Sequence, residues 1–363
     1  MGTRSLPVSV GIVAATLALA GCSADASTER PLIGVAMPTT TSARWISDGD
    51  NVKSQFEALG YDVDLEYAED DVPTQITQLE TMVADGADAL VIGAIDGSAL
   101  TEVLAAADEQ DIPIISYDRL IRDSDAVDYY VTFDNYKVGV QQGTSLLMGL
   151  GVINTDGSRS DVLGPVDIEL FAGSLDDNNA HVFWQGAMDT LQPYLDDGTL
   201  VVRSGQTTID EASTLRWDGE TAHARMQQLL TASYSDGSTV DGVLAASDGL
   251  ARGVLQALSE AGYSGTEMPV VTGQDSEVDS VKLIVEGVQF SSIFKDTRQL
   301  AEAAVSMVHA LLLGATPEAN DTTSYDNGVK TVPSYLLNPQ LVTKENYLAV
   351  LVDGGYYTAE ELN

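Results

Sequence analysis

From Leu32 onward, short apolar runs alternate with longer segments that have helical periodicity. The apolar runs are rich in valine, isoleucine and leucine, a composition typical of strands buried on both faces of a parallel sheet. The predicted strands span 32–37, 62–67, 89–92, 112–117, 129–133, 167–172, 200–204, 242–246, 269–273 and 289–294. The predicted helices span 45–59, 73–84, 98–108, a segment beginning after 134–135, 179–191, 217–232, 248–261, 278–286 and 297–313.

This alternation runs through two similar cycles, and the longest break, the loop 151–165, lies inside the second. Alternating strands and helices predict an α/β fold with parallel sheets. The chain has 363 residues, and at roughly 150 residues per domain its length is typical of two domains. We therefore expect two Rossmann-like lobes.

The N-terminus has the pattern of a secretory signal. Leu6 to Ala20 is an apolar stretch of 15 residues, shorter than the roughly 20 residues that span a bilayer. It ends in Leu19-Ala20-Gly21-Cys22, which resembles the lipobox of bacterial lipoproteins. We predict a signal peptide over 1–21, lipid on Cys22, and a tether over 22–31 that anchors the chain to the outer face of the cytoplasmic membrane. The alternative is a plain signal peptide with a chance cysteine.

Charge and missing motifs exclude several classes of function. Lysine and arginine number 17 against 55 acidic residues, and the net charge of −38 repels nucleic acid. A single cysteine excludes a disulfide framework and a multi-thiolate metal site, and the three histidines cannot form an HExxH motif. Dinucleotide, P-loop and nucleophile-elbow motifs are absent from the sequence, so we expect no cofactor, no metal and no enzyme.

Acidic doublets occur at 70–71, 176–177 and 196–197. They could be metal ligands or the carboxylates of a glycosidase, but solvated loops of an acidic protein are the favoured interpretation.

Polar side chains follow the predicted strands at the edge where open α/β sheets bind ligands. They combine carboxylates, amides, cations and indoles. A sugar hydroxyl both donates and accepts hydrogen bonds, and the C–H faces of a pyranose are apolar. The set therefore favours a neutral, hydroxyl-rich ring as ligand.

Several motifs occur in the order found in one family. They include GVAMPTTTSARW, SYDRLIR, FAGSLDDNNA, TLRWDG, VTGQDSEV and SSIFKDTR. From about Pro31 to Asn363 the chain resembles the periplasmic sugar-binding receptors of the galactose and xylose group. This resemblance implies the type I periplasmic-binding-protein fold, with two lobes joined by three crossovers and a monosaccharide in the cleft. It also implies a monomer that delivers sugar to ABC permease subunits. The alternative partner is a membrane sensor kinase.

The resemblance also assigns ligand contacts to nine positions: Arg44, Trp45, Asp118, Arg119, Asn179, Trp217, Asp248, Asp275 and Lys295. In this assignment the two tryptophans stack on the sugar ring, and the charged and amide groups bind its hydroxyls. Asn178 is a rival of Asn179, and Ser247 is a rival of Asp248. Other roles also stay open: Asn179 as a helix cap, and Lys295 in a hinge ion pair with Asp296.

We place the three crossovers near Asp134, Lys295 and Val332. The first lobe would then comprise 32–134 and 296–332, and the second lobe 135–295 and 333–363.

Overall fold

The computed structural model describes residues 1–3, 30–162 and 164–362. The chain divides into two compact units, Met1–Arg30 and Pro31–Asn363. Cys22 and most of the predicted signal peptide and tether lie outside the described residues. Within the described part of the chain, no helix combines the length and the apolar character that crossing a membrane requires.

The first lobe is built on a six-stranded parallel sheet in the order β11-β5-β4-β3-β1-β2. Its strands are β1 (Leu32–Met37), β2 (Asp62–Tyr67), β3 (Ala89–Ile92), β4 (Ile114–Tyr117), β5 (Tyr129–Phe133) and β11 (Ser334–Leu337). Its helices are α1 (Ala43–Ala58), α2 (Val72–Ala84), α3 (Thr101–Asp108) and α10 (Thr297–Leu312).

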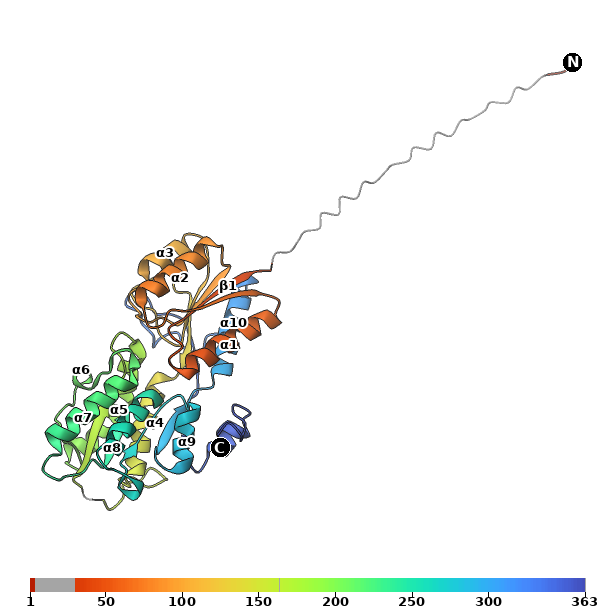
Figure 1. The fold of residues 1–363 in the computed structure, drawn as a ribbon. Helices are drawn as coiled ribbons and strands as arrows, with labels where there is room; N and C mark the ends of the chain where they lie inside the picture. Colours follow the sequence, from red (N-terminus) through yellow and green to blue (C-terminus); the bar gives the residue numbers. More distant parts are fainter. Residues whose placement is uncertain (4–29, 163, 363) are drawn as a thin grey trace. The chain divides into compact units, whose positions relative to one another are not determined.

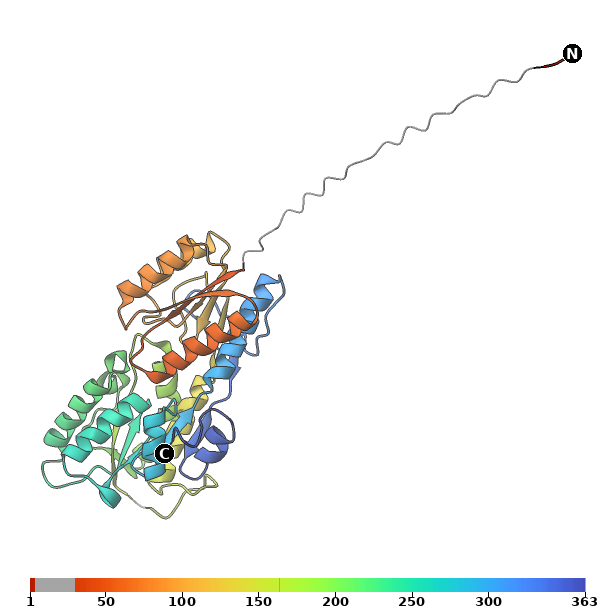
Figure 2. The same ribbon diagram turned by 45° about the vertical axis from the view of Figure 1, so that its right-hand side comes forward.

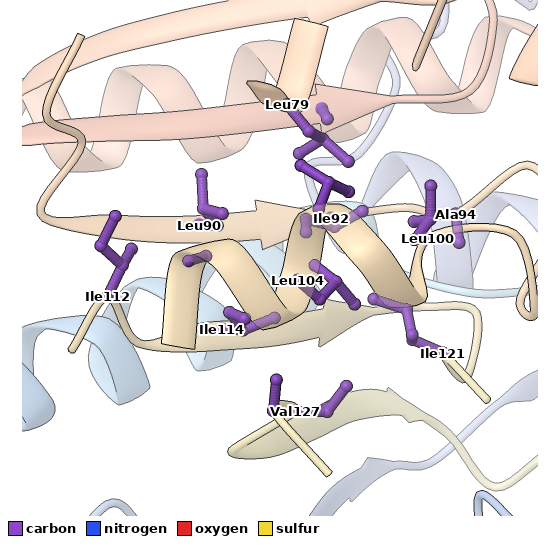
Figure 3. Close-up of a cluster of buried hydrophobic side chains, with 14 of the residues drawn as sticks. Leu79, Leu90, Ile92, Ala94, Leu100, Leu104, Ile112, Ile114, Ile121 and Val127 are labelled. Carbon is purple, nitrogen blue, oxygen red and sulfur yellow. The ribbon is translucent and has the colours of Figure 1, made fainter. Parts of the chain in front are cut away.

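Two apolar cores cover the two faces of this sheet. Helices α2 and α3 pack on one face, where Leu79 and Leu104 meet Leu90, Ile92 and Ile114 of the strands (Figure 3). Helices α1 and α10 lie side by side on the other face (Figures 1 and 2). Because both faces are buried, the inner strands β1 and β3 are almost entirely apolar, as their sequence predicts, whereas the edge strand β2 alternates acidic and apolar residues.

The second lobe contains a four-stranded parallel sheet in the order β7-β6-β8-β9 and an antiparallel pair, β10-β12. Its strands are β6 (Val166–Phe171), β7 (Leu200–Val202), β8 (Gly242–Ala245), β9 (Val270–Val271), β10 (Ser291–Phe294) and β12 (Gln340–Thr343). Its α-helices are α4 (Asn135–Gly149), α5 (Asn178–Asp196), α6 (Ile209–Ala212), α7 (Gly219–Ser233), α8 (Asp248–Glu260) and α9 (Val278–Glu286). Short helical turns span Leu215–Trp217, Gly265–Glu267 and Leu348–Val352.

The chain passes between the lobes at three places. Asp134 follows β5 and caps α4, and its side chain accepts a hydrogen bond from the Lys137 amide at 3.0 Å. Helix α4 then packs closely on α5: a Cβ added to Gly139 would lie 2.0 Å from the Phe183 carbonyl oxygen. After β10 the chain enters α10, which returns to the first lobe.

The third crossover does not lie near Val332, where we predicted it. Residues Ser334–Leu337 form β11, which pairs with β5 in the sheet of the first lobe. The physical reason is burial on both faces, because Leu336 packs into one core of that lobe while Tyr335 and Leu337 pack into the other. The chain crosses only after Leu337, before β12 begins at Gln340.

Candidate functional site

A cleft with a volume of about 440 Å³ lies between the two lobes. Of the nine predicted contact residues, eight line it: Arg44, Trp45, Asp118, Arg119, Asn179, Trp217, Asp275 and Lys295. They come from α1, the end of β4, α5, the turn before α7, and the segments that follow β9 and β10. Parallel strands end at one edge of each sheet, which brings these distant residues together.

Four charged side chains form a buried cluster in the cleft. Arg44 Nη1 lies 2.9 Å from Asp118 Oδ2, and Lys295 Nζ lies 3.0 Å from Asp275 Oδ1. Two longer contacts close the cluster, from Lys295 Nζ to Asp118 at 3.8 Å and from Arg44 Nη1 to Asp275 at 3.9 Å. Lys295 therefore pairs within the cleft, while Asp296 pairs instead with Arg298 at 2.7 Å.

The cluster sets the ionisation of Asp118. Burial by itself raises the pKa of this carboxyl, but the positive charges of Arg44 and Lys295 outweigh burial and bring the pKa below its ordinary value. Asp118 is therefore an ionised acceptor at neutral pH, able to receive hydrogen bonds from hydroxyl groups.

The two indoles occupy different environments. Trp45 is 4% exposed, and the guanidinium carbons of Arg44 and Arg119 lie 4.3 and 5.1 Å from its ring centroid. Trp217 is half-buried and meets Phe183 edge to face, with ring centroids 6.2 Å apart. Its ring presses on Gly173, where an added Cβ would lie 2.1 Å away, so only glycine fits there.

Trp217 does not begin a helix, contrary to our prediction of a helix over 217–232. Arg216 and Trp217 adopt left-handed backbone angles, with φ of 57° and 56°, and α7 begins at Gly219. The Asp218 side chain caps that helix by accepting from the Thr221 amide at 2.7 Å. Asp118 and Asp275 also have positive φ, 60° and 92°. Such conformations cost roughly 1–3 kcal/mol each and persist only where the surroundings hold them.

Asn179 connects the two lobes. Its Nδ2 donates to the Asp118 carbonyl of the first lobe at 2.8 Å, and its Oδ1 accepts from Asn135 of the second lobe at 2.9 Å. It is not the helix cap, because α5 begins at Asn178 and is capped by Asp177. The rival Asn178 does not line the cleft; its Oδ1 accepts from Arg122 at 2.7 Å.

Asp248 lies beneath the cleft and does not line it, whereas its rival Ser247 does. The Asp248 carboxyl is fully buried and accepts from the Glu277 amide at 2.8 Å and from Gln289 at 2.9 Å. Burial, together with the charge of Glu277, raises its pKa to about 8. Both residues lie after β8, and the strand-end pattern could not show which of the two side chains faces the cleft.

The doublet at 176–177 is not a solvated loop, contrary to our favoured interpretation. Asp177 is 4% exposed, and its carboxylate lies 3.1 Å from Arg119 Nε of the other lobe. Asp176 pairs with Arg216. The position of this doublet after a buried strand was the signal that could have identified it.

Further bonds hold the lobes together across the cleft. Ser42 of the first lobe donates to Glu277 Oε1 at 2.8 Å, and the Gly97 amide donates to the Asp176 carbonyl at 3.2 Å. With the Arg119–Asp177 pair, these contacts define a closed arrangement of the lobes. Ser42, Glu277 and Phe183 line the cleft and were missed by the sequence analysis.

Among residues 1–3, 30–162 and 164–362, no group of three or more histidine, cysteine or acidic side chains is arranged to hold a metal ion.

Two parallel-sheet lobes, three crossovers and a polar cleft between them are the features of a two-lobed binding protein. Residues 33–316 match the family model described as a periplasmic binding protein domain. The chain belongs to this family, and the predicted fold class is confirmed.

Three relatives show how close the similarity is. The chain is 55% identical over 336 residues to the multiple sugar-binding periplasmic receptor ChvE of Rhizobium radiobacter, covering 92% of this chain and 93% of that protein. A solved ABC transporter solute-binding protein from Clostridium phytofermentans, with bound β-D-glucose, is 47% identical, with a TM-score of 0.86 and coverage of 92% and 100%. A carbohydrate transporter solute-binding protein from Chloroflexus aurantiacus, in complex with D-glucose, is 35% identical, with a TM-score of 0.80 and coverage of 91% and 97%. These relatives are binding proteins, in agreement with the expectation that the chain is not an enzyme.

We predict that Lys295→Met lowers the free energy of unfolding by about 3 kcal/mol at pH 7, because it leaves two buried carboxylates with less compensating charge. Lys295 helps to lower the pKa of Asp118, and a lowered carboxyl pKa stabilises the folded state above the unfolded pKa. The difference in the free energy of unfolding between Lys295→Met and the wild type should therefore shrink as the pH falls below about 4. Denaturant unfolding at pH 7 and pH 3.5 measures both effects. The exposed Lys344→Met is the control, and an equal loss in both variants would contradict the prediction.

Proposed function

We propose that this chain is the extracytoplasmic receptor of an ABC importer and binds a free monosaccharide between its lobes. The observation that carries the proposal is the cleft itself. There Arg44 and Lys295 each lie within 4 Å of carboxylate oxygens of both Asp118 and Asp275, and two tryptophans line the same space. A volume of about 440 Å³ lies in the range of roughly 300–1,000 Å³ that is typical of small-molecule sites.

A buried polar atom without a hydrogen-bond partner supports a hydroxyl-rich ligand. Trp217 lines the cleft, and its Nε1 is buried and has no hydrogen-bond partner. Leaving such a group unsatisfied costs about 1–3 kcal/mol. The indole N–H needs an acceptor, and a sugar hydroxyl supplies one.

Binding and closure are coupled in this proposal. The contacts come from both lobes, so a sugar is bound more tightly by the closed arrangement than by an open one. Only this difference in affinity can drive closure. Micromolar affinity requires about 8 kcal/mol, which is within reach of a ligand with about a dozen heavy atoms.

An ABC permease is the membrane partner we propose, because the glucose-bound relative at 47% identity is a solute-binding protein of an ABC transporter. A sensor kinase would use the same closed form. Binding of the sugar-loaded chain to purified permease subunits, compared with a purified sensor domain, separates the two partners.

The first prediction is direct binding of D-glucose, the sugar bound in two of the related structures. Calorimetry should give a Kd in the micromolar range or below. A saturating sugar should raise the melting temperature by several degrees, since 100-fold excess over Kd adds about 2.7 kcal/mol. A screen with galactose, xylose, arabinose, fucose and glucuronate ranks the alternatives. The proposal fails if none of these sugars gives heat or a thermal shift.

A second prediction concerns the indole in the second lobe. Trp217→Ala should weaken D-glucose binding by about 2 kcal/mol or more, because a large aromatic anchor is lost. Trp184→Ala removes an indole from the same lobe outside the cleft and should leave affinity unchanged. Calorimetric titration of both variants makes the comparison, and unchanged affinity in Trp217→Ala would count against the site.

We also propose that Cys22 carries the lipid that anchors the chain at the outer face of the cytoplasmic membrane. The support is the Leu19-Ala20-Gly21-Cys22 sequence at the end of the apolar stretch. Cys22→Ser should abolish incorporation of labelled fatty acid and move the protein from the membrane fraction to the soluble fraction. The matched variant Ser23→Ala should do neither. Retained labelling in Cys22→Ser would refute the anchor.

A further inference from the structure

One buried carboxylate beside the cleft has no part in the function described so far. Asp48 lies on α1, four residues after Arg44, and is completely buried. It does not line the cleft. Charged side chains are rarely buried without a partner, and this one has two.

The first partner is Arg44. Arg44 Nε donates to Asp48 Oδ2 at 2.7 Å, and Arg44 Nη2 lies 2.6 Å from the same oxygen. Asp48 thus holds the side of the guanidinium that faces away from Asp118. Because a guanidinium is planar and rigid, fixing two of its nitrogens also fixes the third. That third nitrogen, Nη1, is the one that lies 2.9 Å from Asp118 in the cleft.

The second partner is Tyr117, the last residue of β4. Its hydroxyl donates to Asp48 Oδ1 at 2.5 Å, and its side chain is fully buried. Tyr117 directly precedes Asp118, so the contacts run in a closed ring from Tyr117 to Asp48, to Arg44, to Asp118 and back along the chain. This ring ties the start of α1 to the end of β4.

We propose that Asp48 and Tyr117 are positioning residues for the ligand site: together they hold the Arg44 guanidinium in the orientation that presents Nη1 to the cleft. Neither residue touches the ligand space, and both act through Arg44. The inference rests on the proposed sugar-binding function and adds to it two residues that determine affinity from behind the site.

The ionisation of Asp48 provides an independent signature. Burial raises its pKa, Arg44 opposes this and Asp118 adds to it, and the resulting pKa is about 6. The charged and titratable groups that act on or around it are Arg44, Asp118, Tyr117, Tyr67 of β2 and Tyr356 of the C-terminal segment. Below pH 6 a protonated Asp48 holds Arg44 less firmly, so wild-type affinity for D-glucose should fall between pH 7 and pH 5.

The test is a double-mutant cycle measured by calorimetry with D-glucose on the full chain. Asp48→Asn should raise Kd by about tenfold, and Tyr117→Phe by a smaller factor. In an Arg44→Met background, neither change should alter Kd by more than about twofold, because the residue they position is gone. Asp48→Asn should also flatten the pH dependence of Kd.

Two variants serve as controls. Asp50→Asn removes an exposed carboxylate from the same helix, and Tyr61→Phe removes a tyrosine hydroxyl that contacts His309 in the same lobe. Both should keep the wild-type Kd. If Asp48→Asn does not fold, the double-mutant cycle is measured with Tyr117→Phe and Arg44→Met alone.

The outcomes separate the two proposals. If wild type binds no sugar, the proposed function is wrong. If wild type binds D-glucose and the Asp48 and Tyr117 variants bind it equally well, the positioning role is refuted. Equal losses in the wild-type and Arg44→Met backgrounds would also refute it, since they would show a general structural effect.

Discussion

Four charges that are almost completely removed from water meet between the lobes. Arg44 and Asp118 come from the first lobe, while Asp275 and Lys295 follow strands of the second. A buried charge costs several kcal/mol unless an opposite charge compensates it. The cluster joins one pair from each lobe through the longer contacts at 3.8 and 3.9 Å, so closure of the lobes and pairing of the charges depend on each other.

Backbone geometry places these four side chains in the cleft. Parallel strands end at a common edge, where the chain leaves the sheet. Asp118 makes this turn with a positive φ, while its carbonyl accepts from Tyr130, Thr132 and Asn179. Three donors on one carbonyl hold a conformation that would otherwise be unfavourable. One of the donors belongs to the second lobe, so the turn is best supported when the lobes are together.

Much of this arrangement could be predicted from sequence because it follows from strand order. Inner strands such as β1, β3 and β8 are almost entirely apolar, and the polar residues after parallel strands fall at one edge by topology. Tertiary contacts explain the predictions that were wrong. Trp217 leaves the helix because Gly173 admits its ring, and β11 joins the first lobe because both of its faces meet apolar cores. Periodicity could not show that the Asp248 side chain does not line the cleft, or that Asp177 forms an ion pair with Arg119 of the other lobe.

The most direct test is a crystal structure of the chain grown with D-glucose. The account predicts one sugar between Trp45 and Trp217, with hydroxyl oxygens within about 3.2 Å of the carboxylates of Asp118 and Asp275. A sugar bound elsewhere, or a closed cleft that holds only water at saturating D-glucose, would contradict it.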